Sequence, residues 1–142
     1  MTGAQAAYGL AITNSIQLAI DEINAAGGIL GATVKLSTKD DQGTPAEAVS
    51  GFNSLLSEGA SAIIGATLSS CTSAITSLAD DEGIVLVTPS STADSITTKD
   101  DYVFRSCFKD SFQGEMVAAY AKDQGWTKAA VLYATGDTYS SG

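Results

Sequence analysis

The stretch Ala62-Ile63-Ile64-Gly65-Ala66-Thr67-Leu68-Ser69-Ser70-Cys71-Thr72 decides the fold of this chain. A short apolar run leads into a hydroxyl-rich loop, and the loop opens a helix. The pattern returns at Ile84-Val85-Leu86-Val87-Thr88-Pro89-Ser90-Ser91-Thr92. In a parallel α/β sheet such loops lie at the carboxyl ends of the strands, where ligands bind. Two of them side by side predict half of a small-molecule pocket, offering hydroxyls and helix N–H groups to an anion such as a carboxylate.

The rest of the chain alternates between helical and extended patterns. Apolar residues at helical spacing, followed by glycine, predict helices near 10–26, 45–57, 71–82 and 111–124. Short apolar or alternating runs predict strands near 33–39, 61–65, 84–88, 102–105 and 129–133. This alternation predicts an α/β fold with a parallel, doubly wound sheet of the flavodoxin or Rossmann kind.

Length and charge narrow the class of protein. The 142 residues are enough for one domain with a modest core. A net charge of −9 with seven scattered basic residues argues against nucleic-acid binding, which requires clustered Lys and Arg. No apolar stretch approaches the roughly 20 residues that span a membrane, so we expect no membrane insertion by this segment.

The residue types that are missing argue against most catalytic chemistry. The chain has no histidine, which excludes His-dependent triads, His metal sites and imidazole acid–base chemistry. It also lacks a glycine-rich phosphate loop and a Gly-x-Ser-x-Gly elbow. We therefore expect no enzyme activity, no metal and no cofactor. Cys71 and Cys107 are interpreted as free thiols, although a disulfide between them is left open.

An acidic pair, Asp40-Asp41, suggests an alternative function, that of a phosphoacceptor receiver domain. Phosphoacceptor receiver domains also carry an acidic pair after a strand, on the same kind of sheet. Their chemistry needs a further Asp at the end of a central strand, where this chain reads Gly65-Ala66-Thr67. It also needs a lysine where this chain has Phe104-Arg105-Ser106. Asp40-Asp41 is therefore interpreted as a loop cap near the rim of a cleft.

The order of these motifs resembles the type I periplasmic binding proteins, in particular the leucine/isoleucine/valine-binding receptors of ABC transporters. The resemblance covers essentially the whole chain. The matching pieces are Thr2-Gly3, Tyr8-Gly9, Ala19-Ile20-Asp21-Glu22-Ile23-Asn24-Ala25-Ala26-Gly27-Gly28-Ile29, Asp40-Asp41, Gly65, Ser69-Ser70, Thr72, Asp81-Glu82-Gly83-Ile84, Thr88-Pro89, Phe104-Arg105, Gln113-Gly114 and Gly136-Asp137-Thr138-Tyr139-Ser140-Ser141-Gly142.

The resemblance implies two α/β lobes that enclose a ligand between them. On that plan, residues 1–107 are first-lobe material, and residues 108–142 are the opening helix and strand of the second lobe. The plan also places a strand before Met1, and most of the second lobe after Gly142. We therefore expect a chain that is truncated at both ends.

The resemblance further implies which residues bind the ligand. The hydroxyls of Ser69 and Thr92 and the amide of Ser70 would meet the carboxylate of an amino acid, and the main-chain carbonyl of Ser90 would accept from its ammonium. A helix N-terminus, which carries roughly +0.5 charge, suits a carboxylate near Ser69. The alternative is that these residues are only caps and turn residues.

Two tyrosines complete the implied site. Tyr8 would form an aromatic wall of the cleft, with packing onto the first helix as its alternative. Tyr139 would lie over the ligand from the second lobe. The acidic partner of the ligand ammonium would come from second-lobe residues beyond this chain, so no candidate is named.

The resemblance implies the solute-binding component of an ABC transporter. Such a receptor is extracytoplasmic, either periplasmic or a cell-surface lipoprotein of a Gram-positive organism, and its signal is removed. It would bind an amino acid, branched-chain or otherwise aliphatic, and deliver it to a membrane permease. The alternative is a ligand-sensing regulatory domain of the same fold. A Rossmann-like hydrolase or transferase is disfavoured by the missing motifs.

Overall fold

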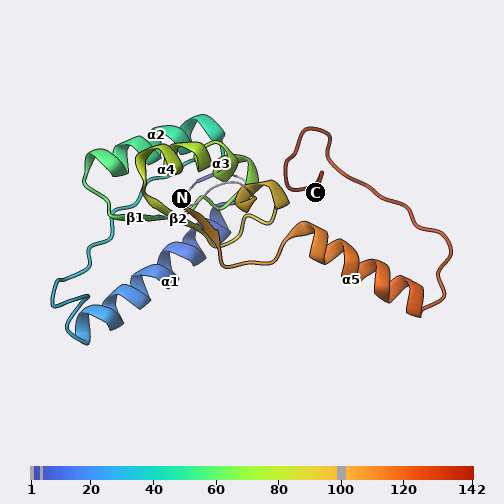
Figure 1. Cartoon of the computed structure of the whole chain (residues 1–142), viewed down its shortest axis with the longest axis horizontal. Coiled ribbons are helices and arrows are strands. Elements are labelled where there is room, and N and C mark those ends of the chain that lie inside the picture. Colours follow the sequence, from blue (N-terminus) through green and yellow to red (C-terminus); the bar gives the residue numbers. More distant parts are fainter. Residues whose placement is uncertain (1, 4, 99–101) are drawn as a thin grey trace.

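A computed structural model describes residues 2–3, 5–98 and 102–142, so Met1 lies outside the described part. Helices and strands alternate along the chain from α1 to α5 (Figure 1). Their bounds are α1 (Ala6–Ala25), α2 (Pro45–Ser57), β1 (Ala62–Ile64), α3 (Ser69–Ser73), α4 (Thr76–Glu82), β2 (Val85–Thr88), the 3₁₀-helix η1 (Asp94–Thr97), β3 (Val103–Arg105) and α5 (Asp110–Asp123).

The three strands form one parallel sheet in the order β1-β2-β3. Ile63 pairs with Leu86, and Leu86 pairs with Val103, so these three side chains share one face of the sheet. All three are buried, and they join Phe52 of α2 and Ile75 in a single core. The parallel sheet and the α/β class predicted from the sequence are therefore confirmed.

Helices lie on both sides of this sheet. Figure 1 shows α2 and α4 on one side of the strands and α1 on the other. The α5 helix and the chain after it extend away from this layered body, and residue 142 returns toward the first turn of α5. The sheet is therefore doubly wound, as the alternating pattern indicates.

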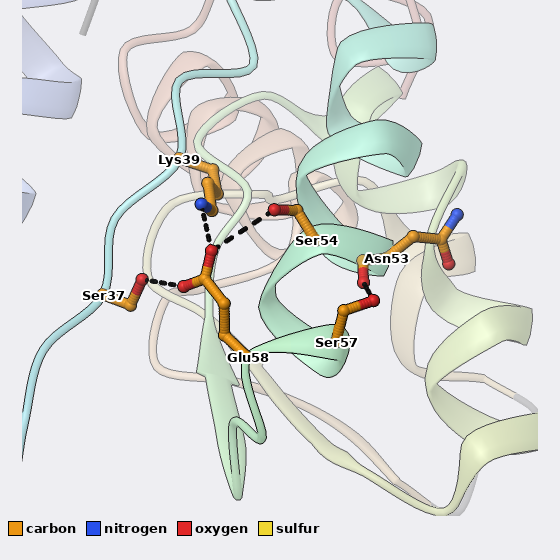
Figure 2. A network of polar contacts seen from close by, with 6 residues as sticks. All are labelled: Ser37, Lys39, Asn53, Ser54, Ser57 and Glu58. Carbon is orange, nitrogen blue, oxygen red and sulfur yellow. Dashed lines mark hydrogen bonds and ion pairs between the residues drawn. The ribbon is translucent and has the colours of Figure 1, made fainter.

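The predicted strand at 33–39 is wrong, because this segment pairs with no strand in the described structure. A strand needs a neighbouring backbone to complete its hydrogen-bond ladder. Here side chains hold the segment instead. The Asn24 amide accepts from the Val34 N–H at 2.8 Å and donates to the Val34 carbonyl at 2.9 Å. Glu58 of α2 accepts from Ser37 and Lys39 (Figure 2).

The predicted strand at 129–133 is also wrong. The described structure gives residues 129–133 no strand pairing, and both Val131 and Leu132 are exposed. An apolar run becomes a strand only where another strand and an apolar layer receive it. Among the described residues, neither a neighbouring strand nor an apolar layer lies against this run.

The predicted helix at 71–82 is in fact two helices, α3 and α4, with a break at Ala74-Ile75. The residues of α3 are mostly Ser and Thr, whose side chains compete for backbone hydrogen bonds. At the break, the Thr76 hydroxyl donates to the Ser73 carbonyl at 3.3 Å. The sequence Thr44-Pro45 is typical of a helix start, and the structure agrees: Thr44 accepts from the Glu47 N–H, and Pro45 is the first helical residue.

Candidate ligand-binding site

The loops after β1 and β2 are joined around one main-chain carbonyl. Because the two strands are parallel neighbours, their carboxyl ends meet at the same edge of the sheet. The Ala66 carbonyl accepts from the hydroxyls of Thr72 at 3.2 Å, Thr88 at 3.0 Å and Ser91 at 3.3 Å. Such buried polar networks fix the geometry of the loops that carry them.

Two further contacts bring the predicted site residues together. The Ser90 hydroxyl donates to the Thr67 carbonyl at 2.7 Å, and the Ala93 N–H donates to the Ser69 hydroxyl at 3.4 Å. Ser69 and Thr92 are only 4 % and 6 % exposed, while Ser70 and Ser90 are half-buried. The structure therefore places all four residues in two adjoining loops. Their role in binding, and the concave surface that they would line, stay predictions.

Thr92 and Asp110 carry buried polar atoms that lack a partner. The Asp110 N–H donates to the Thr92 carbonyl at 3.0 Å, which brings the start of α5 against the second loop. Within the described residues, Thr92 Oγ1 and Asp110 Oδ2 are buried without a hydrogen bond. Gly142 covers this carboxylate, since a Cβ there would lie 2.7 Å from Asp110 Oδ2. Each such atom costs roughly 1–3 kcal/mol.

Arg105, at the end of β3, binds the loop after β2 through its guanidinium group. Its Nη1 donates to the carbonyls of Ser91 and Thr92 at 3.2 and 2.9 Å. Its Nη2 donates to the Ala93 carbonyl at 2.9 Å. Nε and Nη2 also donate to the Thr97 hydroxyl at 3.0 and 2.9 Å. One side chain thus ties three consecutive carbonyls to η1.

The acidic pair Asp40-Asp41 caps its own loop, as predicted. Asp40 accepts from the Gln42 N–H at 3.0 Å, and Asp41 accepts from the Gly43 N–H at 2.9 Å. Hydrogen bonds from the Thr2 hydroxyl and from the Gln42 N–H lower the pKa of Asp40 to about 2. Both aspartates line a shallow hollow together with Thr67 and Leu68 of the first loop.

Both cysteines are free, which confirms their interpretation as thiols. Burial, together with the charge of Asp41, raises the pKa of Cys71 to about 11. Burial also raises the pKa of Cys107, whose Sγ donates to the Ser91 carbonyl at 3.4 Å. A raised pKa keeps the thiol protonated and unreactive. Both therefore act as packing and hydrogen-bonding groups.

The two predicted tyrosines are not brought to the loops. Tyr8 is 62 % exposed in the first turn of α1, and Tyr139 is 51 % exposed in the turn that ends the chain. In the described structure no hydrogen bond or ring contact joins either ring to Ser69 or Thr92. Their proposed contacts with a ligand stay predictions.

Asp110 and Arg105 are the two residues at this site that sequence reasoning missed. Each has a signal in the sequence. Arg105 is the single arginine of the chain and ends an apolar run. Asp110 opens the helix that follows that run after a short connection, residues 106–109, so it lies at the same sheet edge as the two hydroxyl loops.

The described residues hold neither a membrane-spanning helix nor a metal-binding cluster. None of their helices is both long enough and apolar enough to cross a membrane. No group of three or more Cys, Asp or Glu side chains in residues 2–3, 5–98 and 102–142 could hold a metal ion.

Comparison with known proteins places the chain in a family. The periplasmic binding protein family matches the chain over residues 1–142. A Leu/Ile/Val-binding protein of Rhizobium johnstonii is 37 % identical over 121 residues, which is 84 % of this chain and 33 % of that protein. A leucine-, isoleucine-, valine-, threonine- and alanine-binding protein of Pseudomonas aeruginosa is 31 % identical over 143 residues, covering 100 % of this chain and 38 % of that protein.

A solved structure agrees with these relatives. The branched-chain amino acid transporter substrate-binding protein of Streptococcus pneumoniae, in complex with isoleucine, has a TM-score of 0.82 and 40 % sequence identity. The match covers 87 % of this chain and 36 % of that one. The chain thus spans little more than a third of the length of these proteins. It belongs to the periplasmic binding protein family.

Proposed function

We propose that this chain forms one wall of an amino-acid site in the solute-binding component of an ABC transporter. The observation that carries the proposal is the pair of buried, unpartnered atoms, Thr92 Oγ1 and Asp110 Oδ2. They lie at the carboxyl edge of a parallel sheet, which is where ligands bind to this class of fold. Native proteins nearly always give such atoms a partner, so a ligand that supplies one is strongly favoured.

The chemistry of the two atoms suits the two ends of an α-amino acid. A carboxylate oxygen only accepts hydrogen bonds, whereas a hydroxyl both donates and accepts. Asp110 Oδ2 therefore matches an ammonium group, and the Thr92 and Ser69 hydroxyls match a carboxylate. Asp110 reaches a ligand when residue 142 moves away from it, because Gly142 covers this carboxylate here.

The side chain of the ligand is proposed from the relatives. Relatives from Rhizobium johnstonii and Pseudomonas aeruginosa are named for binding leucine, isoleucine and valine, and the Streptococcus structure holds isoleucine. We therefore assign a branched-chain or other aliphatic amino acid to this site. Tyr8 and Tyr139 would enclose it in the closed form.

The remaining parts of the proposal concern the whole protein. Residues 1–107 would belong to a first lobe, and residues 108–142, which include α5, would begin a second lobe. The partner would be the membrane permease of the transporter. The site of action would be outside the cytoplasm, either in the periplasm or on the cell surface.

The test is calorimetric titration of the whole protein with leucine, isoleucine and valine. We expect Asp110→Asn and Thr92→Val each to weaken binding by roughly tenfold or more, because each removes a hydrogen bond to a charged ligand group. Asp123→Asn, at the exposed end of α5, removes the same charge and leaves binding unchanged. Equal affinities in all four proteins would refute the assignment of the site.

A further inference from the structure

The guanidinium of Arg105 donates only to neutral oxygen atoms. Its five hydrogen bonds go to the carbonyls of Ser91, Thr92 and Ala93 and to the hydroxyl of Thr97. Among the described residues no carboxylate forms an ion pair with it. Among the described residues its charge is therefore compensated by three main-chain carbonyl dipoles and one hydroxyl, and its field extends into the loop that it holds.

Those carbonyls belong to peptide groups whose N–H sides serve the proposed site. The Ser91 carbonyl shares a peptide plane with the Thr92 N–H, and the Thr92 carbonyl shares one with the Ala93 N–H. In a trans peptide the C=O and N–H bonds point in opposite directions. Because Arg105 binds the carbonyl side of both planes, both N–H groups point away from it.

The two N–H groups have different acceptors. The Ala93 N–H donates to Ser69 Oγ at 3.4 Å. The Thr92 N–H has no acceptor among the described residues. A hydroxyl that accepts one hydrogen bond still has its own proton to donate. Ser69 can therefore donate to a ligand, and the Thr92 N–H is available beside it.

We propose that Arg105 is the positioning residue for the ligand carboxylate. This inference rests on the proposed function. Arg105 fixes the Thr92 N–H toward the carboxylate, and through the Ala93 N–H it orients the Ser69 hydroxyl to donate. A charged donor on the carbonyl side also polarises both peptide groups, which strengthens their N–H groups as donors. A carboxylate can thus be bound by neutral groups, while the half-buried guanidinium of Arg105 acts on it through the peptide groups that it holds.

The role requires the shape of arginine as well as its charge. The planar fork with five N–H donors reaches three carbonyls and one hydroxyl at once. The ammonium of lysine is a compact point charge with three donors and no fixed plane. Lysine would therefore keep the charge near the loop but hold fewer of the peptide groups in place.

The experiment measures the preference of the whole protein for a carboxylate. Leucine and leucinamide are titrated into the parent protein and into Arg105→Lys and Arg105→Met. We expect leucine to bind roughly 10- to 100-fold more weakly to Arg105→Met, with a smaller loss in Arg105→Lys and little change for leucinamide. Lys122→Met, an exposed charge deletion at the end of α5, keeps both affinities.

A second measurement needs no variant to fold. In the parent protein, leucine should move the amide NMR resonance of Thr92 downfield and slow its hydrogen exchange, and leucinamide should do neither. Equal weakening of leucine and leucinamide in the Arg105 variants would overturn the inference, as would a Thr92 amide that does not respond to leucine. Failure of the parent to bind leucine would instead overturn the proposed function, and the inference with it.

Discussion

The hydroxyl oxygens of Thr72 and Ser91 lie 2.6 Å apart in the interior, and both lie within hydrogen-bond distance of the Ala66 carbonyl, so one hydroxyl donates to the other and the second donates to the carbonyl. Thr72 comes from α3 and Ser91 from the loop after β2, so a single buried contact joins the two halves of the candidate site. Both side chains are fully buried. Removal of the Thr72 hydroxyl therefore takes one partner from Ser91 and one from the Ala66 carbonyl.

Thr72→Val tests that contact. Valine fills nearly the same volume but cannot accept from or donate to Ser91. We expect the free energy of unfolding to fall by about 1–3 kcal/mol, because the variant loses two buried hydrogen bonds that are each worth roughly 0.5–1.5 kcal/mol. Urea denaturation measures it. Thr38→Val makes the same change at an exposed position and should cost far less. Similar losses in the two variants would contradict the proposed importance of the network.

The pKa of Cys71, raised to about 11 from an ordinary value of 9.0, predicts how stability depends on pH. Between these two values the unfolded chain releases the thiol proton and the folded chain keeps it. Since the unfolded state then binds fewer protons, stability falls as pH rises through this range. Below about pH 8 the thiol is largely protonated in both states and contributes little slope.

Cys71→Ala should therefore lose less stability than the parent between pH 8.5 and pH 10.5. Urea denaturation across this range, at constant ionic strength, gives the slope for each protein. Ser73→Ala, a small change at an exposed position of the same helix, should keep the parental slope. A Cys71→Ala slope equal to that of the parent would show that the thiol does not titrate differently in the folded state.

Glu58 anchors the segment that leads into Asp40-Asp41. Its carboxylate accepts from Ser37 and Lys39, and from the Ser54 hydroxyl at 3.4 Å (Figure 2). Hydrogen bonds from Lys39 and Ser37 lower the pKa of Glu58. Glu58→Gln removes the charge, so we expect trypsin to cleave after Lys35 and Lys39 several-fold faster. Ser57→Ala, whose hydroxyl bonds only to the Asn53 carbonyl of its own helix, is the matched control. Mass spectrometry of timed digests would identify the first cuts.

The lowered pKa of Glu58 also predicts how the stability of the protein changes at acid pH. The stability that Glu58 contributes is present above its unfolded-state pKa and is lost as pH falls through the folded-state value. The Glu58→Gln protein should therefore lose less stability on acidification than the parent. Identical cleavage and identical acid sensitivity would mean that the exposed network does not hold the segment.

A final prediction concerns residues 1–142 taken alone. The proposed site would supply contacts from one wall only, without the enclosure by which compact polar ligands are bound tightly. Gly142 also covers the Asp110 carboxylate here, and the charge-assisted hydrogen bond that it withholds is worth roughly 1.5–3 kcal/mol, about 10- to 100-fold in affinity. We expect no calorimetric binding of leucine, isoleucine or valine below roughly millimolar concentration. Micromolar binding would mean that this chain completes the site by itself.

The sequence by itself determined the fold class and the place of the two hydroxyl loops. Apolar runs of strand length, each followed by Ser and Thr at a helix start, are local signals, because hydrogen bonding and packing of neighbouring residues produce them. They predicted β1, β2, β3 and the α2 cap correctly. The capping role of Asp40-Asp41 was equally local, since each carboxylate accepts from an N–H two residues later.

Only the tertiary structure decided the features that depend on partners distant in the chain. Residues 33–39 and 129–133 have strand-like sequences, yet neither is a strand, because a strand exists only where another backbone completes its ladder. Arg105 and Asp110 became site residues when folding brought them against Ser91 and Thr92, 13 to 18 positions away. The atoms of Ser91 and Thr92 that these two residues contact are main-chain carbonyls, which every residue carries. No pattern of side chains therefore predicts such contacts.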